Sequence, residues 1–348
     1  MQNIEVKDMI IYMKKGPEFR MVGGASPEKK EKAKQELEKA FFDHIESLPK
    51  EVQEKIEKLE YPKSEKEIAL IDFANQETSR LMEEVGVEPH DIPLDNYHII
   101  PPELYEKEFG RRSSAVAHGR RQAIAFNAEN FRDNPILLGM AAIHETLHLK
   151  AQMSFEIEES KDGKNTTPYR EGVTVRSSQL KAAQGNYHEH FRGLHEAIVS
   201  EAEKRLLVKL LDQRELAEEK KWLMSDEAGD LIKKLSDKKK VPKDEIIWVG
   251  KRGSGDWKMV GYRPQREVLD YICGEIHKQF PEQFGDADGV FKEFLKAHFT
   301  GRLLPIARLI DKTFGDGSFR IVGNMDDNNA SGVSHLETLK KSRARVLK

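Results

Sequence analysis

The segment from Asn134 to Lys150 constrains the fold most, because it has the pattern of one long apolar helix. Its start is well marked. Asp133 or Asn134 can cap the free backbone amides of the first turn, and Pro135 stands where a missing N–H costs nothing. Apolar residues then recur at helical spacing, at Leu137, Met140, Ile143 and Leu147. We therefore expect an apolar helix that opens at residue 135.

This helix carries the pattern His144-Glu145-x-x-His148. Residues four apart project from the same helix face, so the two imidazoles can meet on one ion. Two neutral imidazoles suit Zn²⁺, which takes a third protein ligand and keeps one position for water, whose pKa then falls to about 7. Glu145 is placed to take a proton from that water and pass it to a leaving amine. The pattern predicts a zinc site that hydrolyses amide bonds.

A chance occurrence of the same residues is the alternative interpretation. Burying a Glu and two His in an otherwise apolar helix costs free energy unless they have a partner. In a chain with 12 His the pattern arises by chance with a probability of roughly a few per cent. We therefore favour the metal site.

The third ligand decides which class of site this is. A third His six residues after His148 is excluded, because Ser154 stands there and Ala151 replaces the glycine that such a site requires. A Glu on a second helix is the other common solution, and the helical run from Gly193 to Leu211 supplies Glu196. Three nearby histidines are rival candidates: His188, His190 and His195.

The segments His144–His148 and Leu194–Arg205 together resemble the gluzincin metallopeptidases, whose second helix reads approximately Asn-Glu-Ala-x-x-(Glu/Asp). The resemblance is closest to small bacterial minigluzincin-like proteins and runs from about residue 68 to residue 323. It implies Glu196 as the third zinc ligand, and Ser200 or Glu201 as an outer partner of a ligating His. Two positions depart from the family pattern: His195 stands where Asn is common, and Ser200 stands where an acid is commoner.

Hydrolysis of an amide also needs a donor for the developing oxyanion. One of the loop histidines, such as His188, is a candidate, and Tyr169 is another. Tyr262 is a third candidate. Most tyrosines are packing residues, so none of these is singled out by its residue type alone.

The order of elements predicts an α+β fold: a mostly helical zincin-like core with a small antiparallel sheet before the metal helix, further helices and a β-hairpin. We divide the chain into a charged helical N-terminal region at 1–63, a catalytic core at 64–213, a helical C-terminal region at 214–324 and a tail at 325–348. The core begins at the capping box of Ser64 and Glu67. The hairpin is predicted at 244–262.

Four runs are predicted as short strands: Val6–Met13, Tyr97–Ile100, Ser114–Ala117 and Gln122–Asn127. The resemblance implies that the last, which precedes the metal helix, is an exposed edge to which an extended peptide can pair. An ordinary edge strand is the other interpretation. The long segment 153–185 joins the two metal helices, and we expect it to carry a short hairpin and to form a wall that selects substrate.

Charge and composition limit the partners and the compartment. The net charge is −3, from 57 basic and 60 acidic residues, which predicts no nucleic-acid or anionic-membrane surface. The N-terminus lacks the features of a signal peptide, no run of eighteen apolar residues occurs, and the single Cys273 fits a reducing compartment. We expect a cytoplasmic zinc metallopeptidase, an endopeptidase, that acts on a peptide or protein substrate. The alternative is a catalytically silent zincin scaffold that binds or regulates a partner.

Overall fold

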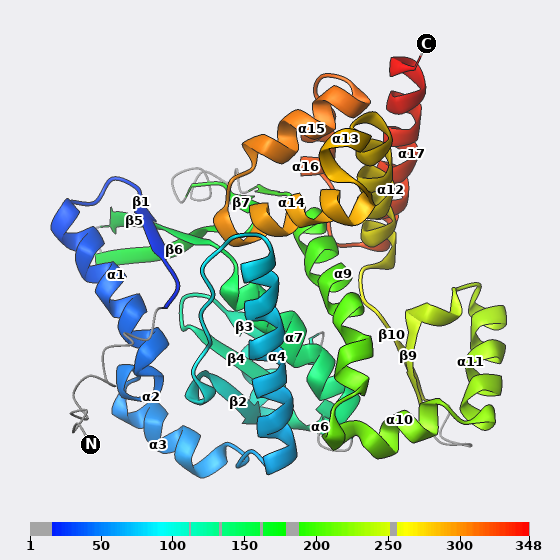
Figure 1. Ribbon diagram of the computed structural model, residues 1–348. Coiled ribbons are helices and arrows are strands. Elements are labelled where there is room, and N and C mark those ends of the chain that lie inside the picture. The colour runs from blue at the N-terminus through cyan, green and yellow to red at the C-terminus, as the bar shows by residue number, and fades with distance from the viewer. Residues whose placement is uncertain are drawn as a thin grey trace, which may run out of the picture.

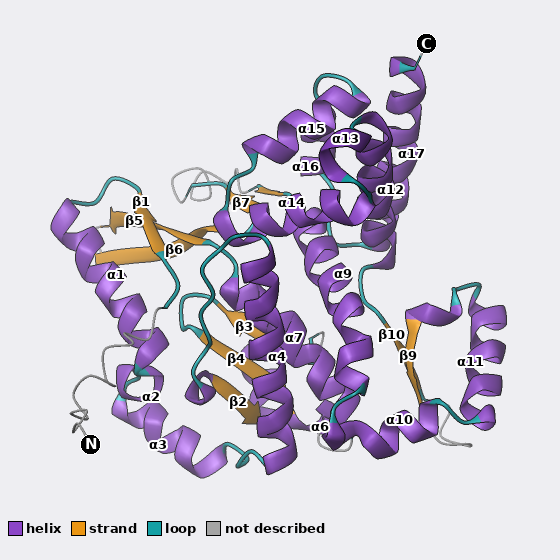
Figure 2. Ribbon diagram, viewed as in Figure 1, coloured by secondary structure: helices purple, strands orange, loops and turns teal. Residues whose placement is uncertain are grey.

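The computed structural model describes residues 16–110, 113–131, 134–160, 163–178, 188–250 and 256–347. The predicted strand Val6–Met13 and the alternative cap Asp133 lie outside these residues. Within them, helices surround three small sheets (Figures 1 and 2). The predicted α+β fold class is confirmed.

The N-terminal region packs against the rest of the molecule. Strand β1 (Phe19–Val22) is followed by helices α1 (Pro27–Phe42), α2 (His44–Ser47) and α3 (Lys50–Leu59). Strand β1 pairs in parallel with β5 (Met153–Ser160), far along the chain. Four residues of β1 and α1 are buried in the main apolar core: Phe19, Ala33, Leu37 and Phe41.

Two long helices form the centre of this core. Helix α4 (Glu65–Glu84) begins at the predicted capping box, in which Ser64 and Glu67 accept each other's backbone N–H. It packs along α7 (Pro135–Lys150), which begins where predicted, because the side chain of Asn134 accepts the N–H of Leu137 at 3.2 Å. Helix α7 is buried over most of its length, as its apolar sequence predicts.

A three-stranded sheet lies against α7. Strands β2 (Tyr97–Ile100), β3 (Ala115–His118) and β4 (Ala123–Asn127) stand in the order β2-β4-β3. Strand β3 runs antiparallel to β4, but β2 runs parallel to it, so the sheet is mixed. Around it lie η2 (Leu94–Asn96), α5 (Pro102–Phe109) and α6 (Ala128–Phe131).

The expectation that residues 122–127 form an edge strand is wrong. Strand β4 is the middle strand of its sheet, and all five of its residues are buried. The edge that faces the metal helix belongs to β3, which contacts α7 directly. The reason is that β2, which comes from earlier in the chain, covers the other side of β4.

The connection between α7 and the helix that carries Glu196 forms most of the largest sheet. Strands β5, β6 (Gly163–Glu171), β7 (Thr174–Arg176) and β8 (Glu189–His190) pair antiparallel in sequence order, with β1 outside β5. The short hairpin predicted in this connection is present as β6 and β7.

The second metal helix, α9 (Arg192–Leu211), packs across α7 (Figure 1). The two helices approach closely at Gly139, where an added Cβ would lie 2.7 Å from Cδ1 of Leu210. A side chain at position 139 would therefore require the side chain of Leu210 to move.

After α9 the chain makes a projecting excursion with its own small apolar cluster (Figure 1). It consists of η3 (Arg214–Leu216), α10 (Ala217–Leu223), α11 (Asp226–Lys239), η4 (Lys243–Glu245), β9 (Ile246–Val249) and β10 (Trp257–Met259). Strands β9 and β10 are antiparallel, which confirms the predicted hairpin.

The chain ends in a group of helices that pack beside α9. They are α12 (Arg263–Gln279), α13 (Pro281–Phe284), α14 (Ala287–Thr300), α15 (Leu304–Phe314), α16 (Ser318–Gly323) and α17 (Asn329–Val346). Helix α12 contacts α9, α14 and α17. Among the helices of the described residues, none combines the length and the apolar character needed to cross a bilayer.

Candidate metal centre

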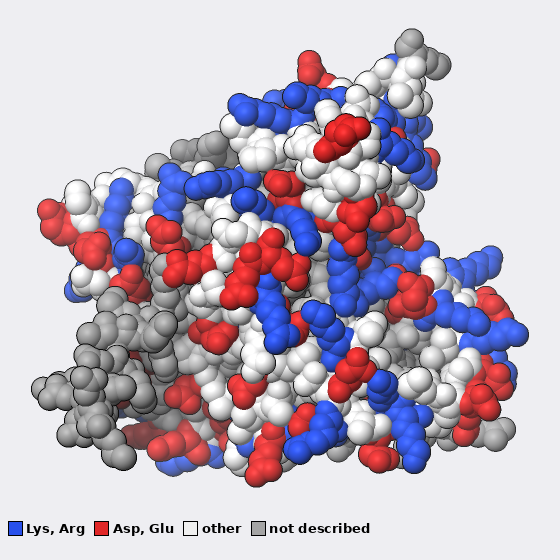
Figure 3. All heavy atoms as spheres, in the orientation of Figure 1, with Lys and Arg blue, Asp and Glu red and all other residues white. Residues whose placement is uncertain are grey.

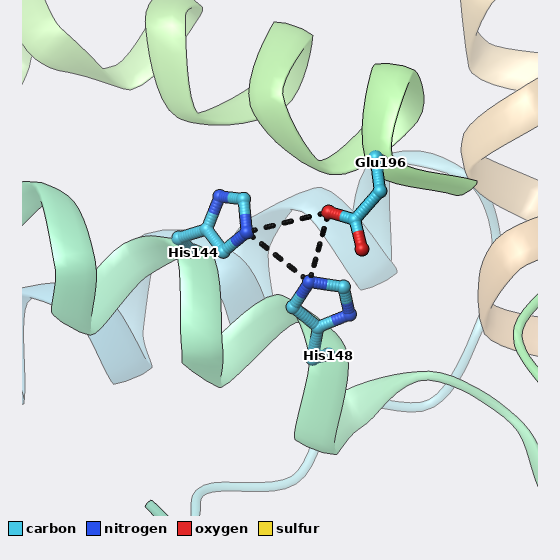
Figure 4. Close-up of side chains that lie close together, drawn as sticks. All are labelled: His144, His148 and Glu196. Carbon is cyan, nitrogen blue, oxygen red and sulfur yellow. Dashed lines mark hydrogen bonds and ion pairs between the residues drawn. The ribbon is translucent and has the colours of Figure 1, made fainter. Parts of the chain in front are cut away.

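Helix α7 brings the two histidines of the His-Glu-x-x-His pattern together. The Nε2 atoms of His144 and His148 lie 3.2 Å apart, and their ring centroids are 4.9 Å apart. This follows from the four-residue spacing, which stacks the two side chains on one helix face. Both nitrogens point toward α9 (Figure 4).

Glu196 of α9 completes a set of three ligand atoms. Its Oε2 atom lies 3.6 Å from Nε2 of His144 and 3.5 Å from Nε2 of His148 (Figure 4). Zinc with nitrogen and oxygen ligands at 2.0–2.1 Å in a tetrahedron places neighbouring ligand atoms about 3.3 Å apart. The three side chains therefore stand at the spacing that a tetrahedral zinc ion requires.

The Oε2 atom of Glu196 supports the same fit. It is buried and has no hydrogen-bond partner among the described residues. A buried carboxylate oxygen without a donor costs free energy, and a cation between the three side chains removes that cost. The donor set of two imidazoles and one carboxylate also suits zinc chemically.

The pKa shifts of these groups show how strongly they interact. Burial opposes the charged form of His144, yet the carboxylates of Glu196 and Glu203 outweigh it and raise the pKa of His144 well above its ordinary value. Burial also opposes ionisation of Glu196, but His148 and His144 hold its pKa well below the ordinary range. Glu196 is therefore ionised, and the neighbouring histidines stabilise its negative charge.

Glu203 contacts Nδ1 of His144, the ring nitrogen that does not face Glu196. Nδ1 of His144 donates to Oε2 of Glu203 at 2.9 Å, which leaves Nε2 free for a metal. The resemblance pointed instead to Ser200 or Glu201, and the structure does not give them this contact. Ser200 is buried with no described partner for its hydroxyl, and Glu201 accepts from Arg205 at 2.9 Å.

Sequence reasoning missed Glu203, although a signal for it exists. Glu203 stands seven residues after Glu196, which is two helical turns and hence the same face of α9. A serine at the position one turn after Glu196 is too short to reach His144, so the longer side chain one turn further on makes the contact.

His195 contacts Nδ1 of His148, the ring nitrogen that does not face Glu196. Its Nε2 lies 2.8 Å from Nδ1 of His148, and the two rings stack with centroids 4.8 Å apart. Burial and the neighbouring His148 hold the pKa of His195 well below its ordinary value, so it stays neutral and can accept from His148. Of the three rival histidines, His195 is thus placed as an outer partner of His148. His148, His195 and Glu171 form a second group whose ligand atoms lie close enough together to hold a metal ion, and this group includes the same contact between His148 and His195.

Gly172 makes room for this arrangement. It has a φ of +55°, and an added Cβ would lie 2.8 Å from Nδ1 of His298 and 2.9 Å from Nδ1 of His195. His298 in turn donates from Nε2 to the carbonyl of Leu147 at 3.0 Å. A glycine between β6 and β7 is therefore required for both rings to pack behind the metal helix.

Glu145 points to the edge of the three-stranded sheet. Its Oε2 accepts the N–H of Ala117 in β3 at 2.7 Å. Burial raises the pKa of Glu145, and the nearby His144 and His148 oppose that shift. The free edge of β3 therefore meets the carboxylate beside the metal ligands.

Tyr262 reaches the metal ligands from the end of the projecting excursion. It precedes α12 with a φ of 52°, which is rare for a residue with a side chain. Its ring stacks on that of His144, with centroids 6.2 Å apart and an angle of 15°. Burial, together with the charges of Glu196 and Glu145, raises the pKa of its hydroxyl, so it remains a proton donor.

The other two predicted donors lie elsewhere. His188 is exposed, and its described contacts are with Ser177 and with the ring of His190. Tyr169 is half-buried in β6, and no described hydrogen bond or ring contact joins it to the metal ligands. Of the three candidates for the oxyanion donor, Tyr262 is the one that the structure brings to His144.

Comparisons of the chain with protein-family models, curated proteins and solved structures give no match.

Proposed function

We propose that this protein is a zinc-dependent peptidase. The observation that supports this most is the triangle of His144, His148 and Glu196, whose ligand atoms lie 3.2 to 3.6 Å apart with one oxygen unpartnered. The sequence resemblance to gluzincins supports the same function. A zinc ion in such a site polarises a carbonyl group and lowers the pKa of water to about 7.

Glu145 is the proton acceptor in this proposal. Its carboxylate lies close enough to His144 and His148 to interact with their charges, so it is placed to accept a proton beside the ligands. It takes a proton from the attacking water and delivers it to the amine that leaves. Its hydrogen bond from Ala117 holds the carboxylate beside the ligands.

The free edge of β3 orients the substrate. Ala117 directs its N–H to Glu145 and not to β4, so this side of β3 faces the ligands. An extended peptide pairing with β3 through main-chain hydrogen bonds places one of its carbonyl groups beside Glu145. Tyr262, whose ring stacks on that of His144, donates a hydrogen bond to the oxyanion as it develops.

The experiment is to compare Glu145→Gln with Glu196→Gln and the wild type. Zinc content and cleavage of a peptide library are measured on the same preparations. We expect Glu145→Gln to retain zinc and to lose about 10²- to 10⁴-fold in turnover, because a general base contributes that much. Glu196→Gln should lose both zinc and cleavage. If the zinc-loaded wild type cleaves no peptide, the proposed function is wrong.

A further inference from the structure

A cavity lies at the end of α7, away from the three candidate ligands. Its volume is about 670 Å³. Its walls come from six places in the fold: β1 with residues 16–18 before it, Met82 of α4, the loop at 87–90, the end of α7 at 150–152, Arg170 of β6, and residues 299–302 at and after the end of α14. None of the metal ligands lines it.

The side chains that line this cavity carry an excess of positive charge. Four are cationic, Arg20, Lys150, Arg170 and Arg302, and two are acidic, Glu18 and Glu88. Figure 3 shows Lys and Arg side chains gathered over the region between β1 and α14. The cations come from four different segments; Lys150 is paired with Asp91 at 3.5 Å, whereas Arg20 and Arg302 have no ion pair among the described residues.

The cations oppose one another's charge. Burial lowers the pKa of Arg170, and the charge of Arg20 lowers it further. The side chain of Lys150 has no exposed surface and lies 3.5 Å from Asp91, so this cation is paired. Arg20 and Arg170, by contrast, lie close enough for their charges to repel each other, and an anion bound between them would relieve that repulsion.

Several donors remain available to a ligand. Arg20 and Arg302 are exposed, and neither side chain has an ion pair among the described residues. Nε2 of His90 is buried and has no described partner. Lys150, by contrast, donates to the carbonyl of Asn75 and to Ser79, at 2.8 and 2.7 Å, and is paired with Asp91, so it is not among the groups open to a ligand.

One wall of the cavity is apolar. It is formed by Phe19 of β1, Met82 near the end of α4 and Phe299 in the last turn of α14. These three side chains are only 2 to 5% exposed, so the wall is closed and the space is open mainly to the polar groups around it. The volume lies within the range of about 300 to 1,000 Å³ that is usual for small-molecule sites.

We propose that this cavity binds a small organic anion, with its phosphate or carboxylate groups against Arg20, Arg302 and the part of the Arg170 guanidinium that does not donate to the carbonyl of Gly301. Binding is driven by charge-assisted hydrogen bonds, which are stronger than neutral ones. The site is independent of the metal centre, so it stands whether or not the protein is a peptidase.

Isothermal titration calorimetry on the full chain tests this site with two probes, AMP and succinate. Either should bind with a Kd below about 1 mM at constant ionic strength. Binding by AMP alone assigns the site to organic phosphates, and binding by succinate alone assigns it to carboxylates. Absence of binding by both overturns the proposal.

Substitutions locate the binding. Arg302→Gln and Arg20→Gln should each weaken it about 10- to 100-fold, because each removes a charged hydrogen bond. Arg214→Gln is the matched control, since that side chain is 94% exposed and lies in η3, away from the cavity. Both lining residues are exposed, so neither substitution disturbs the core. Equal affinity in Arg302→Gln, Arg20→Gln and the wild type would overturn the proposal.

Discussion

Two clusters of histidine and glutamate in this molecule share their residue types and differ in geometry. The first is the metal centre. The second, which we call the histidine chain, consists of Glu60, His98 and His44. Nδ1 of His98 contacts Oε2 of Glu60 at 2.9 Å, and its Nε2 contacts Nε2 of His44 at 2.9 Å. Nδ1 of His44 contacts the carbonyl of Ala40 at 3.3 Å.

The difference between the clusters lies in where the carboxylate stands. In the histidine chain the Nε2 atoms of His98 and His44 contact each other, and Glu60 contacts the opposite ring nitrogen, Nδ1 of His98. In the candidate metal centre the Nε2 atoms of His144 and His148 also contact each other, but an unpartnered oxygen of Glu196 lies 3.6 and 3.5 Å from these same two nitrogens. We therefore expect a metal ion at the candidate metal centre and none in the histidine chain.

We expect substitutions at the two clusters to differ most in their effect on the turnover number, kcat. Tyr262 stacks on a ring of the metal centre, and we expect Tyr262→Phe to lower kcat about 10²- to 10³-fold with little change in KM, because one oxyanion donor is removed. Steady-state hydrolysis of a peptide measures this. Tyr169→Phe and His98→Gln are the controls and should retain wild-type kcat. A Tyr262→Phe enzyme as fast as these controls would remove Tyr262 from the mechanism.

A smaller effect is expected in zinc affinity. Glu203 and Glu60 each lie 2.9 Å from Nδ1 of a histidine, so they are a matched pair. Glu203→Gln should weaken zinc binding about 10- to 100-fold, because Glu203 positions a ligand. Glu60→Gln should leave it unchanged. Competition with a zinc chelator measures both, and equal losses in the two variants would show that the clusters do not differ in this respect.

The smallest effect is expected in the pH dependence of stability. Burial and the neighbouring His98 lower the pKa of His44 to about 4. Between pH 6.5 and 4 the unfolded chain then binds a proton at His44 that the folded chain does not, so the free energy of unfolding falls as the pH falls. His44→Gln should reduce this fall by roughly 1 to 3 kcal/mol.

Urea denaturation at pH 7 and pH 4.5 measures the change. His188→Gln is the control, because His188 is exposed and should leave the pH dependence as it is in the wild type. The same loss of stability on acidification in His44→Gln and wild type would mean that His44 is not the group responsible.

The two clusters also differ in how far the sequence predicts them. His144 and His148 lie four apart on one helix with a marked start, so their meeting can be derived from helical geometry. The histidine chain joins α2, the end of α3 and β2, which no local pattern connects. Local periodicity predicts contacts within an element, whereas contacts between distant segments depend on packing.

This dependence on packing also explains why the sequence did not predict the place of β4 in its sheet or the outer partner of His144. The sequence predicts β4 as a strand, but its place in the middle of the sheet depends on β2 pairing with it in parallel. It predicts Glu196 on α9, but the partner of His144 depends on which side chain of α9 reaches it. Tyr262 has no local signal, because it arrives through the turn that ends the excursion.

The most direct test of the contrast between the two clusters is the zinc content of the purified protein. The protein is loaded with zinc and desalted, and its zinc is measured by inductively coupled plasma mass spectrometry. We expect about one zinc ion per chain in the wild type and in His98→Gln, and a large loss in Glu196→Gln. A wild type without zinc, or a Glu196→Gln variant that holds as much zinc as the wild type, would contradict the assignment of the metal centre.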